Sequence, residues 1–135
     1  MEEETFGLHQ TLDCYRCDEK ALDDLETVSR FLNELVSSIG MRKMLEPIVM
    51  YAPPVTEKDG GGVSGFVMIN ESHISIHTFP NRRFITMDVY SCKKFDTEKV
   101  KEIATKFFGA AVFEENKINR GKKFRKLATL VAGRG

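Results

Sequence analysis

The sequence has no excess of either charge, no long apolar run and few cysteines. Its 135 residues include 20 Lys and Arg against 20 Asp and Glu, a balance that argues against a general nucleic-acid-binding surface. No apolar stretch approaches the ~20 residues of a membrane-spanning helix, and the acidic start MEEETF is unlike a secretory signal. The three cysteines are an odd number. We therefore expect a cytoplasmic protein with free thiols and no membrane partner.

The sequence does contain enough apolar material for a folded core. Hydrophobic residues make up 41% of the chain, and the length fits one domain spanning residues 1–135. From Lys117 onward every charged residue is basic. Such a tail can bind nucleic acid or an acidic partner, but from about residue 121 we expect a solvated, frayed end.

Apolar spacing predicts helices and strands. Between Ala21 and Ile39 the apolar residues recur every three or four positions, as in an amphipathic helix, with Asp18 as N-cap and Gly40 as stop. A second helix is expected between Asp96 and Gly109. The elements follow the order β-α-β-β-β-α-β, which predicts an α+β two-layer sandwich with one antiparallel sheet and two helices on one face. Strands are expected over residues 6–15, 43–51, 63–69, 73–79, 84–91 and 110–118.

The stretch ESHISIHTFP, from Glu71 to Pro80, is rich in chemically active side chains. A zinc site built from the Cys14-x-x-Cys17 motif with His73 and His77 is disfavoured, because four residues of a strand span roughly 13 Å and separate the two imidazoles. We therefore expect no metal site there. We expect Cys14 and Cys17 to be buried or half-buried thiols, and His73 to be a packed or surface histidine. A Ser-His hydrolase is disfavoured as well, since no G-x-S-x-G elbow is present.

A resemblance explains the stretch better. The pattern GVSG…INESHISIHTFP…DVYSC resembles the small bacterial and archaeal S-adenosylmethionine decarboxylases, in which ESH-x-x-IHT marks a self-cleaving Glu-Ser bond. The resemblance extends from Gly7, in GLHQTLDCYRCD, to the NRG at 119–121. It implies a proenzyme that is cut between Glu71 and Ser72 into residues 1–71 and 72–135.

The resemblance also assigns roles to individual residues. Ser72 becomes a pyruvoyl group, the cofactor that forms a Schiff base with the substrate amine. His77 matches the histidine required for processing, and Ser64 matches a serine that assists it. Cys92 matches the catalytic acid, and Asp13 matches an acidic residue near the substrate.

The processing chemistry explains why these residue types are needed. The Ser72 hydroxyl attacks the preceding carbonyl and converts the amide into an ester. A base then removes the Ser72 Cα proton, the ester leaves by β-elimination, and dehydroalanine hydrolyses to pyruvoyl and ammonia. Strain at a turn beginning near Asn70 would favour the reaction, and a histidine such as His77 is a residue type suited to act as the base. Because Ser72 and His77 are five residues apart, a regular strand points them to opposite faces, so Ser72 must lie in the turn or a bulge must intervene.

The substrate is less firmly indicated than the reaction. Relatives usually read HTWPE, with a glutamate that holds the ribose hydroxyls, whereas this chain has HTFPN with Asn81 there. Tyr51 and Phe66 are candidates for stacking on adenine. The leading hypothesis is decarboxylation of S-adenosylmethionine for spermidine and other polyamine synthesis. The alternatives are the same machinery acting on arginine or ornithine, and an inactive regulatory relative. The family suggests a homodimer of cleaved protomers.

Overall fold

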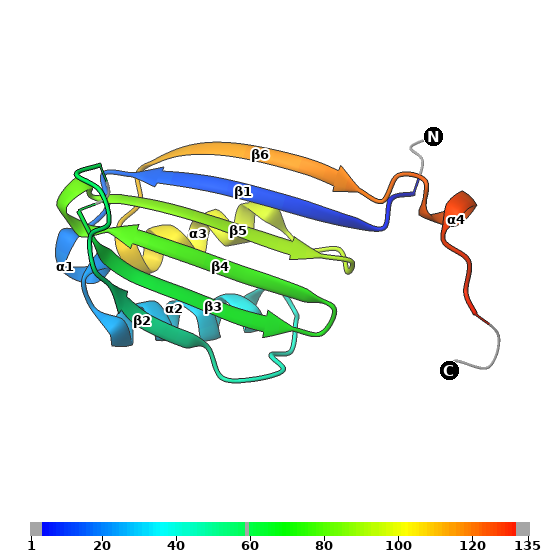
Figure 1. Ribbon diagram of the computed structural model, residues 1–135, viewed down its shortest axis with the longest axis horizontal. Coiled ribbons are helices and arrows are strands. Elements are labelled where there is room, and N and C mark those ends of the chain that lie inside the picture. Colours follow the sequence, from blue (N-terminus) through cyan, green and yellow to red (C-terminus); the bar gives the residue numbers. More distant parts are fainter. Residues whose placement is uncertain (1–3, 59, 132–135) are drawn as a thin grey trace.

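The computed structural model, which describes residues 4–58 and 60–131, is built on one six-stranded antiparallel sheet (Figure 1). The strand order is β2-β3-β4-β5-β1-β6. The strands are β1 (Gly7–Tyr15), β2 (Ile48–Ala52), β3 (Gly62–Ile69), β4 (Ser72–Phe79), β5 (Phe84–Ser91) and β6 (Val112–Arg120).

The two longer helices lie on one face of this sheet and leave the other face uncovered (Figure 1). The longer helices are α2 (Leu25–Ser38) and α3 (Thr97–Phe108). Their apolar faces pack with every second residue of the strands into one buried core, because alternate side chains of a strand point to opposite faces. The predicted α+β two-layer sandwich is therefore confirmed. We call the uncovered side the open face.

Two details of the predicted elements are wrong. Four strands lie between α2 and α3, in agreement with the four predicted ranges 43–51, 63–69, 73–79 and 84–91, so the predicted order β-α-β-β-β-α-β left out one of them. The first predicted helix is divided into α1 (Glu19–Leu22) and α2, because Asp24 adopts an extended conformation and its carboxylate accepts hydrogen bonds from Thr27. Such capping begins a new helix. Asp18 caps α1 as predicted, and Asp96 and Gly109 bound α3.

Some boundaries also differ. The strand predicted over 43–51 begins only at Ile48, and Lys43 contributes an isolated bridge to Ile69. A short 3-10 turn, η1 (Pro80–Arg82), connects β4 to β5. The tail includes a short helix, α4 (Phe124–Leu127), whose Phe124 ring contacts Phe6 while Arg125 pairs with Glu4. The described part of the tail is therefore attached to the N-terminal segment. In the described residues, none of the helices is long and apolar enough to span a membrane.

Both products of the predicted cleavage contribute strands to the sheet. Strands β1, β2 and β3 precede Ser72, and β4, β5 and β6 follow Glu71. Strand β1 pairs with β5 on one side and β6 on the other. A cut at this bond would thus leave two fragments joined by continuous antiparallel pairing.

Candidate active site

The Glu71–Ser72 bond lies at a tight turn between β3 and β4. Ile69 pairs with Ser72, so only Asn70 and Glu71 connect the two strands. The backbone of Glu71 has a φ of +62°, a left-handed conformation that a residue with a Cβ seldom adopts. Such conformations store strain at functional sites. The expected strained turn is therefore present, and Ser72 is the first residue of the strand that follows it.

The Ser72 hydroxyl is held by Ser91, the last residue of β5. Its Oγ donates a hydrogen bond to the Ser91 Oγ, at 2.8 Å. Ser91 is buried, accepts another bond from the backbone N–H of Lys93, and donates to the Sδ of Met41. Ser91 thereby orients the reactive hydroxyl. The sequence reasoning overlooked this residue, although its place beside Cys92 in DVYSC could have indicated it.

Cys92 lies next to the cleavage turn. Its Sγ donates to the Glu71 Oε2, at 3.1 Å. Burial, together with the hydrogen bond and negative charge of Glu71, raises the pKa of the Cys92 thiol. The thiol therefore keeps its proton at neutral pH, as a proton donor must. We call the group of Glu71, Ser72 and Cys92 the cleavage end.

A second group of predicted residues lies near the other end of the same strands. Ser64 on β3 and His77 on β4 are paired, and the Ser64 Oγ lies 2.8 Å from the His77 Nδ1. His77 pairs onward with Thr86 of β5, which pairs with Asp13 of β1. Two interstrand spacings put Asp13 about 10 Å from His77. We call the group of Ser64, His77 and Asp13 the histidine end.

Within one chain, the cleavage end and the histidine end lie far apart. Ser72 and His77 are five residues apart on β4, about 17 Å along an extended strand. The pairing of β4 with β3 and β5 is continuous and begins at Ser72 itself. Ser72 therefore lies in the strand and no bulge intervenes, so the expectation that one of these arrangements brings Ser72 and His77 together is wrong. Ser72 shares the helix-facing side with Ile74 and Ile76, whereas His77 is exposed on the open face. His77 therefore cannot reach Ser72 within the same chain.

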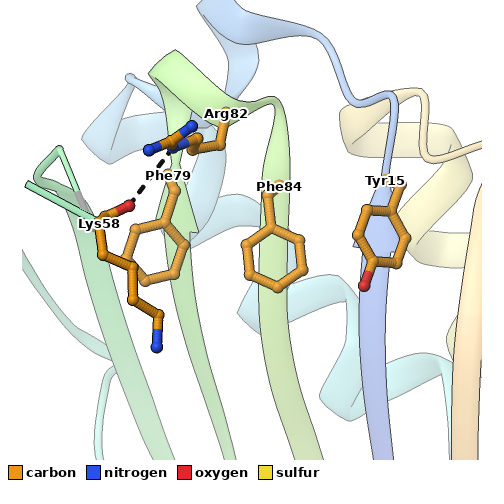
Figure 2. A pocket seen from close by; sticks show the side chains of 5 residues that line it. All are labelled: Tyr15, Lys58, Phe79, Arg82 and Phe84. Carbon is orange, nitrogen blue, oxygen red and sulfur yellow. Dashed lines mark hydrogen bonds between the residues drawn. The ribbon is translucent and has the colours of Figure 1, made fainter.

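An aromatic-walled cavity of about 390 Å³ lies beside the histidine end (Figure 2). The rings of Phe79 and Phe84 stack with centroids 5.7 Å apart, and Tyr15 continues the row at 5.2 Å from Phe84. The Nε of Arg82 donates to the backbone carbonyl of Lys58 at 3.3 Å, which closes one side. Asn81 lies in η1 (Pro80–Arg82), next in sequence to the lining residue Arg82, but is not itself part of the lining. A flat row of rings with charged side chains at its border suits a planar, polar ligand.

The aromatic residues named from sequence lie elsewhere. Tyr51 pairs with the buried Val63 and its hydroxyl donates to the Asp23 carbonyl, so it belongs to the helix-facing side. Phe66 lies on the open face but stacks on His73, away from the cavity. The cavity's aromatic row was missed, although Phe79 follows His77 by two positions and could have indicated it.

The cysteine pair is not part of either end. Cys14 and Cys17 are fully buried, as expected, and burial raises their thiol pKa values to about 12 and about 11. They lie in the core beneath the sheet, while His77 is exposed on the open face. The four residues of the zinc set considered from sequence therefore do not converge.

Comparisons with known proteins agree with this geometry. The family model described as S-adenosylmethionine decarboxylase matches residues 8–121. An S-adenosylmethionine decarboxylase proenzyme of Persephonella marina is 32% identical over 120 residues, 88% of this chain and 85% of the relative. A proenzyme of the same name from Pyrococcus abyssi is 30% identical over 119 residues, 87% of this chain and 81% of the relative.

The fold has a counterpart among solved structures. The crystal structure of the adenosylmethionine decarboxylase from Aquifex aeolicus superposes with a TM-score of 0.73 at 24% identity, and covers 98% of both chains. That likeness concerns the fold. The family match spans most of the chain and includes the turn at Glu71 and Ser72, the thiol of Cys92 and the His77–Ser64 pair, and on these grounds the chain belongs to the S-adenosylmethionine decarboxylase family.

Proposed function

We propose that this chain is a pyruvoyl-dependent decarboxylase that matures by cutting itself between Glu71 and Ser72 and acts on S-adenosylmethionine. Its product would be the aminopropyl donor for spermidine synthesis. The observation that carries the proposal is the contact of the Cys92 thiol with the Glu71 carboxylate at the turn with positive φ. The contact brings the proposed proton donor to the residue preceding Ser72.

The residues around Ser72 fit the formation and use of this cofactor. A pyruvoyl ketone supplies an electron sink for the bond to the departing carboxylate. Ser91 holds the Ser72 hydroxyl beside the strained turn before cleavage. Cys92 keeps a proton at neutral pH because burial and Glu71 raise its pKa. It can therefore protonate the substrate carbon after carbon dioxide leaves.

The roles proposed for His77 and Ser64 require a second copy of the chain. They lie about 17 Å along β4 from Ser72, too far for proton transfer within one chain. A two-fold axis between two open faces, running across the strands, would place the histidine end of one copy over the cleavage turn of the other. Because the Ser72 hydroxyl points to the helix-facing side in the uncut chain, contact with His77 of the second copy also requires Ser72 to turn toward the open face. Each homodimer would then contain two composite sites.

The open face is suited to such packing. Apolar side chains that are 39–63% exposed lie on it in three strands, β2, β3 and β6. A face of this kind is normally covered in a functional assembly. These side chains are Ile48, Met50, Phe66, Met68, Val112 and Ile118. Asp13 and the aromatic row beside Asn81 would enter each composite site with His77, and the row offers a surface on which an adenine ring can stack.

The substrate assignment is supported by the names of the relatives. The Persephonella and Pyrococcus proteins are both named S-adenosylmethionine decarboxylase proenzymes, and no feature of the cavity favours arginine or ornithine. The direct test measures carbon dioxide release from S-adenosylmethionine, arginine and ornithine by the purified protein. We expect release from S-adenosylmethionine. Turnover of arginine or ornithine alone would overturn the substrate and leave the pyruvoyl mechanism intact.

Co-expression of two inactive variants tests the composite site. Ser72→Ala lacks the nucleophile but keeps His77, and His77→Ala has the opposite defect. In a mixed dimer, one site combines the intact Ser72 with the intact His77. We therefore expect the His77→Ala chain to be cleaved when both are co-expressed, but not when it is expressed alone. If co-expression restores no cleavage, the two-copy site is wrong; if His77→Ala alone is cleaved normally, His77 has no role in processing.

A further inference from the structure

Two histidines and an aspartate outside the proposed reaction converge in the middle of the open face. His9 comes from β1, His73 from β4 and Asp88 from β5. Strand β5 lies between the other two strands. The sheet therefore brings together three side chains that are far apart in the sequence.

The three side chains direct their ligand atoms to one point. The His9 Nε2 lies 2.5 Å and the His73 Nε2 3.3 Å from the same oxygen, Oδ2 of Asp88. All three ligand atoms lie within 4.8 Å of one another. Ligands of a tetrahedral zinc ion are about 3.3 Å apart, so an ion requires the His9 ring to move by on the order of 1 Å.

Neighbouring groups fix these side chains. The Ser75 hydroxyl donates to the other oxygen of Asp88, Oδ1, and leaves Oδ2 directed at the histidines. The His73 ring stacks on Phe66, and the Tyr90 ring contacts both imidazoles. Burial raises the pKa of the Asp88 carboxyl, but hydrogen bonds from Ser75 and His9 and the interaction with His73 outweigh it and leave the pKa lowered. The group is therefore an anion at neutral pH.

We propose that His9, His73 and Asp88 bind one divalent transition-metal ion, with zinc as the preferred ion. Two imidazoles and one carboxylate are a common ligand set for zinc, whereas magnesium prefers oxygen ligands. In the single chain these side chains are 20–34% exposed on the open face, so a fourth ligand such as water can reach the ion. In the proposed homodimer, which covers this face, the fourth ligand would be a water in the interface or a group of the second copy. Binding requires both rings to carry their proton on Nδ1 and to give the Nε2 lone pair to the metal.

The ion would link two parts of the mature protein. His9 lies before the proposed cut, while His73 and Asp88 lie after it. If the chain is cleaved as proposed above, the metal holds the two fragments together at the centre of the sheet. Metal binding itself does not depend on cleavage, because all three ligands are already placed in the uncut chain.

The test is a calorimetric titration of chelator-treated full-length protein with zinc chloride alone. We expect saturation at one ion per chain and a rise in melting temperature. Removing a ligand in His9→Gln or Asp88→Asn should weaken binding by more than the ~100-fold that loss of an outer-shell contact causes. His77→Gln, which removes a histidine outside the cluster, should bind as the wild type does. The uncleaved Ser72→Ala chain should also bind, so a failure of processing would not affect this result.

Cobalt(II) provides a second measurement on the wild type, which does not depend on how the variants fold. Bound cobalt should show d–d absorption without the charge-transfer bands of a thiolate ligand. Absence of saturable binding would overturn the proposal. So would equal binding by His9→Gln, or thiolate bands, which would assign the metal to a cysteine.

Discussion

The cleavage end and the histidine end share strand β4 but differ in how the fold holds them. At the cleavage end, Ser72 follows a strained turn, and its hydroxyl points to the helix-facing side and bonds to Ser91. At the histidine end, the Ser64–His77 pair lies on the open face beside an aromatic cavity. The cleavage end holds the bond that we propose is cut, and the histidine end holds the proposed base and binding surface. The comparison shows that one chain can contain every proposed catalytic group and still lack a complete site.

Replacing the nucleophile of the cleavage end should have the largest effect. Ser72→Ala removes the hydroxyl that attacks the Glu71 carbonyl, so we expect one full-length band on a denaturing gel and no decarboxylation. The wild type should give two bands that elute together under native conditions, because β1 pairs with β5 and β6. Ser37→Ala, on helix α2, is the control and should be cleaved. A wild type that stays a single band after long incubation would contradict the pyruvoyl mechanism.

Replacing the thiol separates processing from turnover at the same end. Cys92→Ala should still be cleaved but should lose ~10²–10⁴-fold in kcat, the usual contribution of a general acid, with more abortive transamination. Cys17→Ala is the matched control: its thiol is buried in the core, so the change should lower stability more than turnover. Single-turnover rates and the masses of the products are the measurements. A loss of only about twofold for Cys92→Ala would exclude its catalytic role.

A substitution at the histidine end should improve binding. A charged hydrogen-bond acceptor contributes ~1.5–3 kcal/mol and a neutral one ~0.5–1.5 kcal/mol. The difference of about 1–2 kcal/mol corresponds to roughly five- to thirty-fold in affinity. If Asn81 contacts the ribose diol from beside the aromatic cavity, Asn81→Glu should lower the KM for S-adenosylmethionine by that factor. Arginine and ornithine have no ribose and serve as controls. An unchanged or higher KM for S-adenosylmethionine would place the ribose elsewhere.

The smallest effect concerns the charge of Glu71 at the cleavage end. Glu71 raises the pKa of the Cys92 thiol, so its removal should lower that pKa and increase the thiolate fraction at neutral pH. In the uncleaved Ser72→Ala background, Glu71→Gln should speed alkylation of Cys92 about fivefold, since a nearby unit charge in a solvated site contributes ~1 kcal/mol. The pH dependence of iodoacetamide labelling measures the shift. A profile that does not move, or moves to higher pH, would contradict the contact.

Local patterns predicted the elements well where short-range physics decides them. Asp96 and Gly109 bound helix α3 as expected, because a cap acts within one turn of the chain. The break at Asp24 was missed, since the apolar spacing continues through it and only the backbone conformation reveals a second cap. All four strands between α2 and α3 were predicted as residue ranges, and only the written order β-α-β-β-β-α-β omitted one of them.

The candidate site was predicted residue by residue but not as an arrangement. The motif around Ser72 identified Ser64, His77 and Cys92, and their roles there remain predictions. Ser91 and the row of Tyr15, Phe79 and Phe84 were not found. Their proximity depends on pairing between strands that are distant in the sequence.

By itself, the sequence determined the family, the two-layer fold and the position of the turn at Glu71 and Ser72, because motifs, apolar spacing and caps are local properties of a chain. The tertiary structure alone decided which of these residues meet. Strand register placed Cys92 against Glu71 and gathered His9, His73 and Asp88 at one point. Register depends on long-range pairing and on the two-residue period of side chains, so no local pattern could reveal these contacts.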